Sequence, residues 1–286
     1  MDFSDVFQSE QEKSRLGLQI RLLEDCERPV FEGLFSGRTG LRVLDIGCSS
    51  GEKTEKVFSH PAVSRVIGLE RNREAAEQAQ RRCGGERFSF YCCDMNNADF
   101  SRKLDSIMAE HGISGFDLIY FSFSLIYMSD PEGLLRDLRG RLAPGGSVMI
   151  LEVDDNRTTI SPDEGKLIPA YVEMMIRNPF TGDRGLCRRL PPLLERCGYT
   201  DVRQFGEDIA AGPGEAEKKQ CLAEMLFSFI PGDVEILRQQ HPDEPLYEQW
   251  SEWVDAHFAQ LWESAVSERA TVSMHPVIVT ARASIY

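Results

Sequence analysis

The stretch from Leu44 to Gly51 reads Leu-Asp-Ile-Gly-Cys-Ser-Ser-Gly and combines a carboxylate with two glycines. It ends an apolar run that begins at Leu41 and precedes a polar segment that begins at Glu52. We therefore expect a strand, a turn and a helix in this order. Glycines in such a turn permit a tight backbone and the close approach of a ligand, which side chains would prevent. The stretch predicts a nucleotide-binding loop.

The glycine spacing distinguishes this loop from two common phosphate-binding loops. A dinucleotide-binding loop reads G-x-G-x-x-G, whereas this loop reads G-x-x-x-G. A Walker loop ends in Gly-Lys-Ser/Thr, and the pair Lys53-Thr54 lacks the preceding glycine. The pattern argues against both kinds of phosphate recognition. The alternative without a ligand is a glycine turn after a buried strand.

Two further apolar runs end in a carboxylate. The run from Arg65 ends at Glu70, roughly 20 residues after the loop, where nucleotide-binding α/β sheets place an acid on the ribose hydroxyls. Two neighbouring hydroxyls suit an ionised carboxylate, because it only accepts hydrogen bonds. The run from Phe88 ends at Asp94. The alternatives are a solvated strand end for Glu70 and a helix-capping or surface aspartate for Asp94.

Four motifs between residues 41 and 154 resemble, in order, those of the class I S-adenosylmethionine-dependent methyltransferases. Asp45, Gly47 and Gly51 match three positions of motif I, D/E-x-G-x-G-x-G, and Ser49 replaces its middle glycine. Residues 116–124 resemble motif IV. The Leu-Ala-Pro-Gly-Gly turn at 142–146 and the apolar run at 147–153 resemble the turn and fifth strand. The nearest resemblance is to the ubiquinone/menaquinone-biosynthesis type and related small-molecule methyltransferases.

The resemblance implies an α/β fold with a doubly wound, seven-stranded, mostly parallel Rossmann-like sheet, an N-terminal helical lid and helical insertions near the C-terminus. Strand and helix patterns alternate after Gly37, which is typical of a parallel sheet covered on both faces. For the lid, a plain packing helix is the alternative. The expected domains are a lid at 1–36, a core at 37–205 and 269–286 with a helical insertion at about 156–184, and a helical substrate cap at 206–268.

Several elements outside the four motifs are also expected. We predict a helix that begins at Ser161-Pro162 and runs toward Arg177, because serine and proline favour a helix start. A second helix at 186–197 would end at Gly198, and strands would follow at 200–205 and 270–283.

The resemblance implies S-adenosylmethionine as the cofactor and S-adenosylhomocysteine as its product. Glu70 would bind the ribose, Asp94 the adenine amino group, and Met95 would pack on the adenine ring. Cys48 would pack against the cofactor. The complete set of expected cofactor-binding residues is Asp45, Gly47, Cys48, Gly51, Glu70, Asp94, Met95 and Phe121.

Methyl transfer from a sulfonium is an in-line displacement, so the site must align the acceptor in a dry environment, and many acceptors also need a base. The candidates are Tyr127 after the fourth strand, Asp154 after the fifth, and His257 in the aromatic-rich insertion. Tyr127 stands where many relatives have histidine. Asp154 and Asp155 could accept a proton or hold a cationic amine, or they could cap a loop.

Two other features allow a functional and a structural interpretation. Arg177 and Arg184 could bind a carboxylate or phosphate through their planar guanidinium groups, or could clamp the loop between them. Trp250, Trp253 and Phe258 could form one helical face, which would either line an aromatic substrate pocket or join the insertion to the sheet.

No metal is expected. Asp155-Asn156 resembles the metal-binding pair of catechol methyltransferases, but Phe121-Ser122-Phe123 lacks their second aspartate. A hard cation depends on several oxygen ligands, so the loss of one carboxylate removes much of the affinity. The eight cysteines contain no C-x-x-C pair and indicate reduced thiols in a cytosolic protein.

The net charge of −14 opposes a nucleic-acid partner and favours a small molecule. No apolar run approaches the roughly 20 residues of a membrane span, and the acidic start Met1–Asp5 lacks signal-peptide features. We therefore expect a cytoplasmic methyltransferase that acts on a small molecule at O, N, S or C. The alternatives are a catalytically inactive cofactor-binding partner subunit and a protein methyltransferase. The oligomeric state does not follow from these residues.

Overall fold

The computed structural model describes residues 10–283, which divide into two compact units. Helix α2 (Glu10–Phe35) and strand β5 (Leu142–Val153) contribute residues to both units. The parts of the expected lid and core at 1–9 and 284–286 lie outside the described residues. The larger unit comprises residues 27–152, 185–206 and 277–283, and the smaller unit comprises residues 10–26, 153–184 and 207–276.

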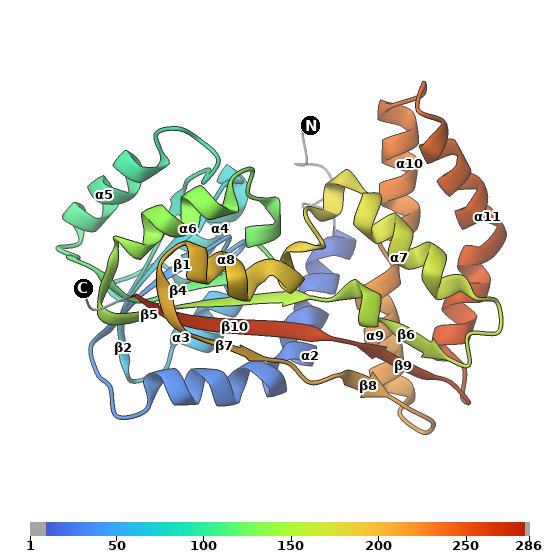
Figure 1. Ribbon diagram of the computed structural model, residues 1–286, viewed down its shortest axis with the longest axis horizontal. Helices are drawn as coiled ribbons and strands as arrows, with labels where there is room; N and C mark the ends of the chain where they lie inside the picture. Colours follow the sequence, from blue (N-terminus) through green and yellow to red (C-terminus); the bar gives the residue numbers. More distant parts are fainter. Residues whose placement is uncertain (1–9, 284–286) are drawn as a thin grey trace. The chain divides into compact units, whose positions relative to one another are not determined.

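The larger unit is built on a seven-stranded sheet with the order β3-β2-β1-β4-β5-β10-β7 (Figure 1). The described pairs among β1 to β5 are parallel, and β10 pairs with β7 antiparallel. The predicted doubly wound, seven-stranded and mostly parallel Rossmann-like sheet is confirmed. Besides β5, the strands are β1 (Leu41–Ile46), β2 (Val63–Glu70), β3 (Phe88–Cys92), β4 (Phe116–Ser122), β7 (Tyr199–Phe205) and β10 (Pro276–Ala283).

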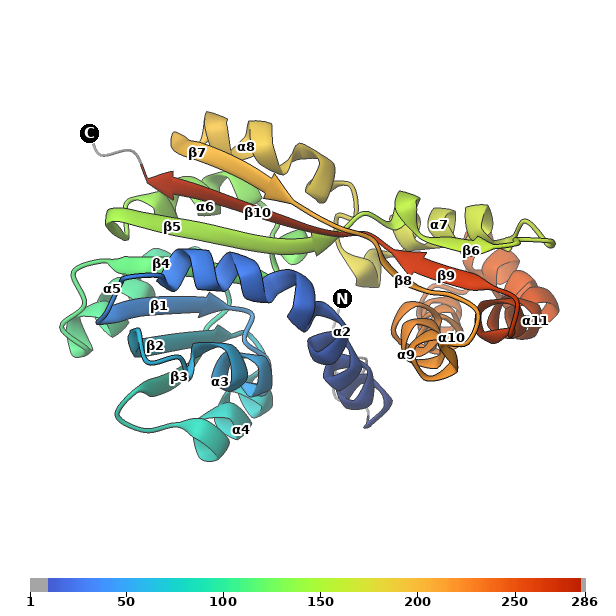
Figure 2. The ribbon, with the colours of Figure 1, turned by 90° about the horizontal axis from the view of Figure 1, so that it is seen from below.

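Helices cover both faces of this sheet, since the strands are apolar on both sides. On one face, Leu44, Ile119 and Val148 form a core with helices α5 (Phe100–Glu110), α6 (Pro131–Arg139) and α8 (Leu190–Arg196). On the other face, Tyr120 packs edge-on against Phe31 of α2 and Phe58 of α3 (Glu52–Phe58), which lie in front of the strands in Figure 2. Helix α4 (Arg73–Cys83) follows β2.

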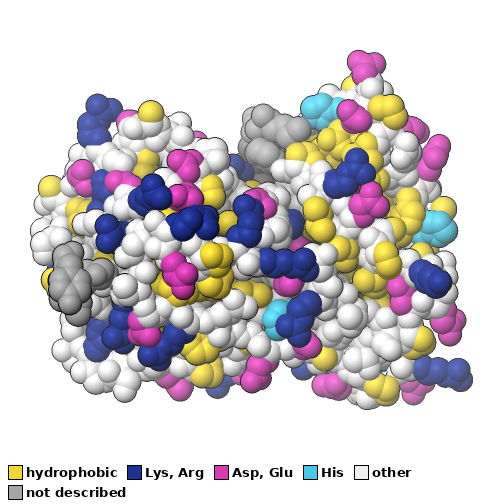
Figure 3. All heavy atoms as spheres, viewed as in Figure 1, with side chains coloured by type: hydrophobic (Ala, Val, Ile, Leu, Met, Phe, Trp, Pro, Cys, Tyr) yellow, Lys and Arg dark blue, Asp and Glu magenta, His cyan; other side chains and the backbone are white. Residues whose placement is uncertain are grey.

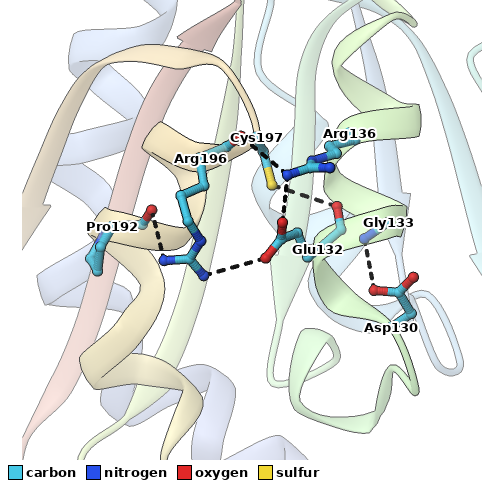
Figure 4. A network of polar contacts seen from close by, with 7 residues as sticks. All are labelled: Asp130, Glu132, Gly133, Arg136, Pro192, Arg196 and Cys197. Carbon is cyan, nitrogen blue, oxygen red and sulfur yellow. Dashed lines mark hydrogen bonds and ion pairs between the residues drawn. The ribbon is translucent and has the colours of Figure 1, made fainter.

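Polar contacts join α6 to α8 (Figure 4). Glu132 of α6 accepts hydrogen bonds from Arg136 at 2.5 Å and from Arg196 at 3.4 Å. Arg136 also donates to the carbonyl oxygen of Arg196 at 3.5 Å, and the Cys197 thiol donates to the carbonyl oxygen of Glu132 at 3.5 Å. These contacts are half exposed, so each stabilises the packing only modestly.

The smaller unit combines helices with a three-stranded antiparallel sheet of order β6-β9-β8. Helix α9 contacts β8 and β9, and α11 contacts α7, α9 and α10. Tyr171 and Phe227 pack edge-on in its core at 4.9 Å between ring centres. The elements are β6 (Thr159–Ser161), α7 (Leu167–Arg177), β8 (Ile209–Ala211), α9 (Ala216–Phe227), α10 (Ile230–Gln240), α11 (Pro245–Val266) and β9 (Thr271–Met274).

Two expected elements differ in the structure. The helix predicted from Ser161 begins at Leu167 instead, because Ser161 pairs in β6 and the Asp163 carboxylate caps the backbone N–H groups of Leu167 and Ile168 at 2.8 and 3.1 Å. The strand predicted at 270–283 is divided at His275 into β9 and β10, which belong to different sheets. The helix at 186–197 is a short 3-10 turn followed by α8, and Gly198 follows with a positive φ of 83°, as expected of a terminating glycine.

Among residues 10–283, no helix is both long and apolar enough to cross a membrane. All eight cysteines are free thiols, four of them buried.

Lys219 gives a test of what stabilises the smaller unit. Its buried ammonium donates to the carbonyl oxygens of Ser267, Glu268 and Ala270 at 2.6, 3.2 and 3.3 Å, just after α11 ends. We expect Lys219→Met to lower the free energy of unfolding by about 2–4 kcal/mol, because three carbonyl oxygens lose their donor and the contact with Ala270 is buried. Urea denaturation followed by circular dichroism measures this loss. The neighbouring Lys218→Met, at a half-exposed side chain, is the control and should change stability by under about 0.5 kcal/mol; equal effects of both variants would contradict the capping role.

Candidate functional site

The loop between β1 and α3 contains three residues in the left-handed backbone region. Gly47, Ser49 and Gly51 have φ values of 79°, 50° and 75°. A Cβ atom on Gly47 would lie 2.5 Å from the Cβ of Ser124, which follows β4, so only glycine fits there. Ser49 occupies the position of the middle motif glycine and adopts a backbone conformation that glycine reaches without strain. The loop is therefore held closely against the end of β4.

Glu70 at the end of β2 connects the neighbouring strand to this loop. Its Oε2 accepts a hydrogen bond from the Ser49 backbone N–H at 3.0 Å, and its Oε1 accepts one from the Asn72 backbone N–H at 2.8 Å. Burial raises the pKa of this carboxyl above its ordinary value, and the two backbone hydrogen bonds counteract part of that rise. Each carboxylate oxygen can accept a further hydrogen bond. The geometry therefore leaves Glu70 able to bind two ligand hydroxyls.

Asp45 lies in β1, one residue before its end, and its side chain is buried. Its Oδ2 accepts a hydrogen bond from the Thr54 hydroxyl at 2.6 Å. Burial raises the pKa of Asp45 to about 7, while Thr54 and the nearby Lys53 lower it in part.

Cys48 packs within the protein beneath the loop. Its sulfur lies 2.9 Å from the position that a Cβ on Gly68 would occupy, and the Phe90 ring fills the same space. Burial raises the pKa of the Cys48 thiol well above its ordinary value. Cys48 is therefore a neutral packing group on β2, and its expected contact with a cofactor stays a prediction.

The loop after β3 contacts the segment after β4. Asp94 accepts a hydrogen bond from the Asn96 backbone N–H at 2.9 Å, and the Asn96 side chain donates to the Tyr127 carbonyl oxygen at 3.2 Å. Met95 is buried. The Arg71 guanidinium lies 6.0 Å from the centre of the Tyr127 ring. The structure thus brings Asp94, Met95 and Tyr127 together at the same edge of the sheet as Glu70.

The end of β4 carries a strained residue and a buried one. Phe121 is fully buried in the hydrophobic core of the sheet, so its expected cofactor contact stays a prediction. Phe123 has a positive φ of 52°, which is unusual for an aromatic residue. The Ser124 hydroxyl donates to the Ile46 carbonyl oxygen at 2.6 Å. Backbone strain of this kind occurs at functional sites.

Sequence reasoning did not identify a buried charged cluster beside the loop. The Lys53 ammonium lies 2.8 Å from Glu27 Oε2 and donates to the Ser122 hydroxyl at 2.9 Å. The Tyr120 hydroxyl donates to the other oxygen of Glu27. Lys53 was visible in sequence as the second residue after the loop, but Glu27 lies on α2, and no local pattern indicated that these side chains meet.

The remaining candidate residues belong to the smaller unit. Asp154 is buried, and its carboxylate accepts a hydrogen bond from the Asn156 backbone N–H at 3.2 Å. Asp155 forms two hydrogen bonds with the Arg184 guanidinium at 2.7 and 2.9 Å. Arg184 therefore holds the segment after β5 in place. Of its two predicted roles, ligand binding and a loop clamp, this contact corresponds to the clamp. His257 is half buried on α11, with its ring 5.6 Å from that of Trp253.

The same unit shows where two other predicted features lie. Arg177 pairs with Glu173 one helical turn earlier at 2.8 Å. Trp250 is buried, whereas Trp253 and Phe258 are half buried. In the part of the chain that the structure describes, no group of three histidine, cysteine or acidic side chains could hold a metal ion.

Comparison with known proteins gives a family for part of the chain. Residues 44–148 match the family description "Methyltransferase domain". A trans-aconitate 2-methyltransferase from Delftia acidovorans is 30% identical over 144 residues, which are 49% of this chain and 48% of the relative. A tRNA U34 carboxymethyltransferase from Alcanivorax borkumensis is 26% identical over 212 residues, which are 72% of this chain and 60% of the relative. The chain thus spans about half the length of the curated relatives that it matches.

A solved structure supports the fold across the whole chain. Phosphoethanolamine N-methyltransferase 2 from Haemonchus contortus, in complex with S-adenosyl-L-methionine, has a TM-score of 0.54 and 15% identity, and the match covers 99% of this chain and 60% of that chain. At this identity the likeness shows the fold alone.

The raised pKa of Asp45 predicts how stability depends on pH. The folded chain holds a proton on Asp45 up to about pH 7, whereas the unfolded chain loses it near the ordinary value of 3.8. The free energy of unfolding should therefore fall as pH rises from about 4 to about 7. In Asp45→Asn this fall should be smaller by up to about 4 kcal/mol. Urea denaturation across this pH range measures it, and Asp99→Asn, at an exposed position, is the control. Parallel pH profiles of wild type and Asp45→Asn would show that Asp45 titrates normally.

Proposed function

We propose, from the match of residues 44–148 to a methyltransferase domain, that the chain is a class I S-adenosylmethionine-dependent methyltransferase. It would transfer a methyl group from S-adenosylmethionine to a small-molecule acceptor by metal-independent in-line displacement. The observation that carries the proposal is the pair of hydrogen bonds between Glu70 and the backbone N–H groups of Ser49 and Asn72. They place an acid with unused acceptor capacity beside a glycine loop, at the point where the strand order reverses between β1 and β4. Open α/β sheets bind their ligands at this point.

The residues of this edge fit a nucleoside with a cationic end. Glu70 would accept hydrogen bonds from the ribose hydroxyls, Asp94 would accept one from the adenine amino group, and buried Met95 would pack on the adenine ring. Asp45 would face the cationic amino-acid end, and Gly47 and Gly51 would let the backbone approach the ligand. When bound, S-adenosylmethionine supplies an electrophilic methyl group on its sulfonium.

The protein's own part in the reaction is alignment, exclusion of water and removal of a proton. Tyr127, Asp154 and His257 stay our candidates for a residue that orients the acceptor or takes its proton. Asp154 is buried, and its carboxylate accepts a hydrogen bond from the backbone N–H of Asn156. This contact would hold the carboxylate in position for a substrate, and it would equally cap the turn that follows β5. The assignments of residues 1–36 as a lid and 206–268 as a substrate cap are part of the same proposal.

The acceptor class rests on charge and on the relatives. A net charge of −14 and a relative named for trans-aconitate, a small molecule, both favour a small acceptor. The match to a tRNA U34 carboxymethyltransferase favours RNA as the second candidate. Lysine and arginine side chains do gather over α6 and α8 in Figure 3, but acidic side chains lie among them, and Glu132 pairs with both Arg136 and Arg196. Such neutralised arginines favour the small molecule.

The first test is ligand binding. We expect calorimetry to show micromolar binding of S-adenosylmethionine and S-adenosylhomocysteine and no binding of NAD. Glu70→Gln should weaken both adenosyl ligands roughly 10- to 100-fold, because it removes a charged acceptor from the ribose hydroxyls. Glu74→Gln, an exposed acid on α4, is the matched control and should bind as the wild type does. Unchanged affinity in a folded Glu70→Gln protein would refute the ribose role, and binding of NAD alone would refute the proposed function.

The second test concerns the acceptor. We expect transfer of a labelled methyl group from S-adenosylmethionine to at least one member of a panel of small carboxylic acids, phenols, amines and thiols, and none to bulk tRNA or protein. Addition of a chelator should leave the rate unchanged. Transfer to tRNA would instead support the second candidate. Cofactor binding without transfer to any acceptor would support an inactive partner subunit.

A further inference from the structure

We propose that Lys53 binds the α-carboxylate of the cofactor's amino-acid end, and that Glu27 on α2 holds the Lys53 ammonium in place for this. The inference rests on the proposed function and assigns a role to a charged cluster that the ribose, adenine and methyl-transfer assignments leave unused. The cluster comprises Glu27, Lys53, Tyr120 and Ser122, all in the larger unit.

The ammonium of Lys53 lies at the ligand-binding edge of the sheet. Ser122, which accepts its hydrogen bond at 2.9 Å, is the last residue of β4. The preceding residue, Phe121, pairs with Ile46 at the end of β1, so Ser122 and Gly47 each directly follow this last pair of the two parallel strands. Lys53 therefore has its charge at the switch point between β1 and β4 and not on the outer surface of α3.

Lys53 is also the cation nearest to Asp45, at the part of the site proposed for the amino-acid end of the cofactor. Its charge acts on Asp45, whereas the charge of Arg71 acts on Glu70, at the ribose end. The negative charges of two further carboxyls, Glu27 and Glu70, raise the pKa of Asp45. An edge with this excess of acid attracts the cationic groups of the cofactor but repels its one anionic group, the α-carboxylate. That carboxylate needs a local cation, and Lys53 supplies one.

Lys53 keeps the capacity and the access for a third partner. An ammonium has three N–H donors, and the described contacts of Lys53 use one toward Glu27 and one toward Ser122. Its side chain is 14% exposed, whereas that of Glu27 is only 4% exposed, so Lys53 is the more accessible member of the pair. Tyr120 fixes Glu27 from the opposite side. The ammonium is thus fixed in position before a ligand binds, which reduces the ordering that binding requires.

A purely structural role is the competing explanation, since the pair also connects α2 to α3 and β4. The two explanations differ in what they predict for a ligand without the carboxylate. Decarboxylated S-adenosylmethionine keeps the adenosine, the sulfonium and the amine and lacks only that group. If Lys53 binds the carboxylate, its loss weakens the binding of S-adenosylmethionine alone. If its role is structural, its loss weakens the binding of both ligands equally.

The experiment measures the dissociation constants of both ligands by calorimetry. We expect Lys53→Met to weaken S-adenosylmethionine roughly 10- to 100-fold and to change decarboxylated S-adenosylmethionine by less than about 3-fold. Lys56→Met removes the same charge from an exposed position on α3 and should leave both constants unchanged. Equal weakening of both ligands by Lys53→Met would overturn the inference while leaving the proposed function intact.

The single variant leaves Glu27 buried without its counter-ion, which can prevent folding. The double variant Glu27→Gln/Lys53→Met removes both charges and should show the same selective loss of S-adenosylmethionine. Glu27→Gln alone should weaken S-adenosylmethionine less than Lys53→Met does, because the ammonium keeps its charge but loses the carboxylate that positions it. A double variant that discriminates between the two ligands as the wild type does would overturn the inference. If the wild type binds neither ligand, the proposed function fails, and the inference fails with it.

Discussion

The structure depends on the contact between the glycine loop after β1 and the carboxylate that ends β2. Two strand ends and one tight turn meet there, and Glu70 accepts the Ser49 backbone N–H at 3.0 Å. The contact requires a backbone turned at Gly47, and Gly47 in turn lies so close to Ser124 that no larger residue fits. Three strands, β1, β2 and β4, therefore present their ends at one place because a single loop conformation connects them.

That arrangement concentrates negative charge in a poorly solvated place. Asp45, Glu27 and Glu70 influence one another, and burial keeps Asp45 protonated to about pH 7. An apolar cluster of the same volume would be more stable, since burying acids without full compensation is costly. A cationic ligand turns this cost into affinity, because its charge stabilises the ionised acids. The charge pattern thus makes sense for a site that receives a sulfonium.

The sequence predicted the sheet and the acids of its edge because both are local signals. Apolar runs that contain Asp45 or lead to Glu70 and Asp94 can be recognised within a few residues, and their alternation with helical patterns predicts a parallel sheet. The Lys53–Glu27 pair could not be predicted, since it joins helices α3 and α2 through side chains alone. The helix start at Leu167 was missed because Asp163 caps it across an intervening turn, and the break at His275 was missed because apolar alternation continues through it.

Cys48 makes the glycine loop accessible to chemical observation. Its thiol lies under the loop against Gly68 and is held neutral by burial, so a thiol reagent reacts with it only while the loop is lifted. The alkylation rate of Cys48 therefore measures how often the loop opens. A ligand that holds the loop in place would slow this reaction, so the alkylation of Cys48 would report cofactor binding without any knowledge of the methyl acceptor.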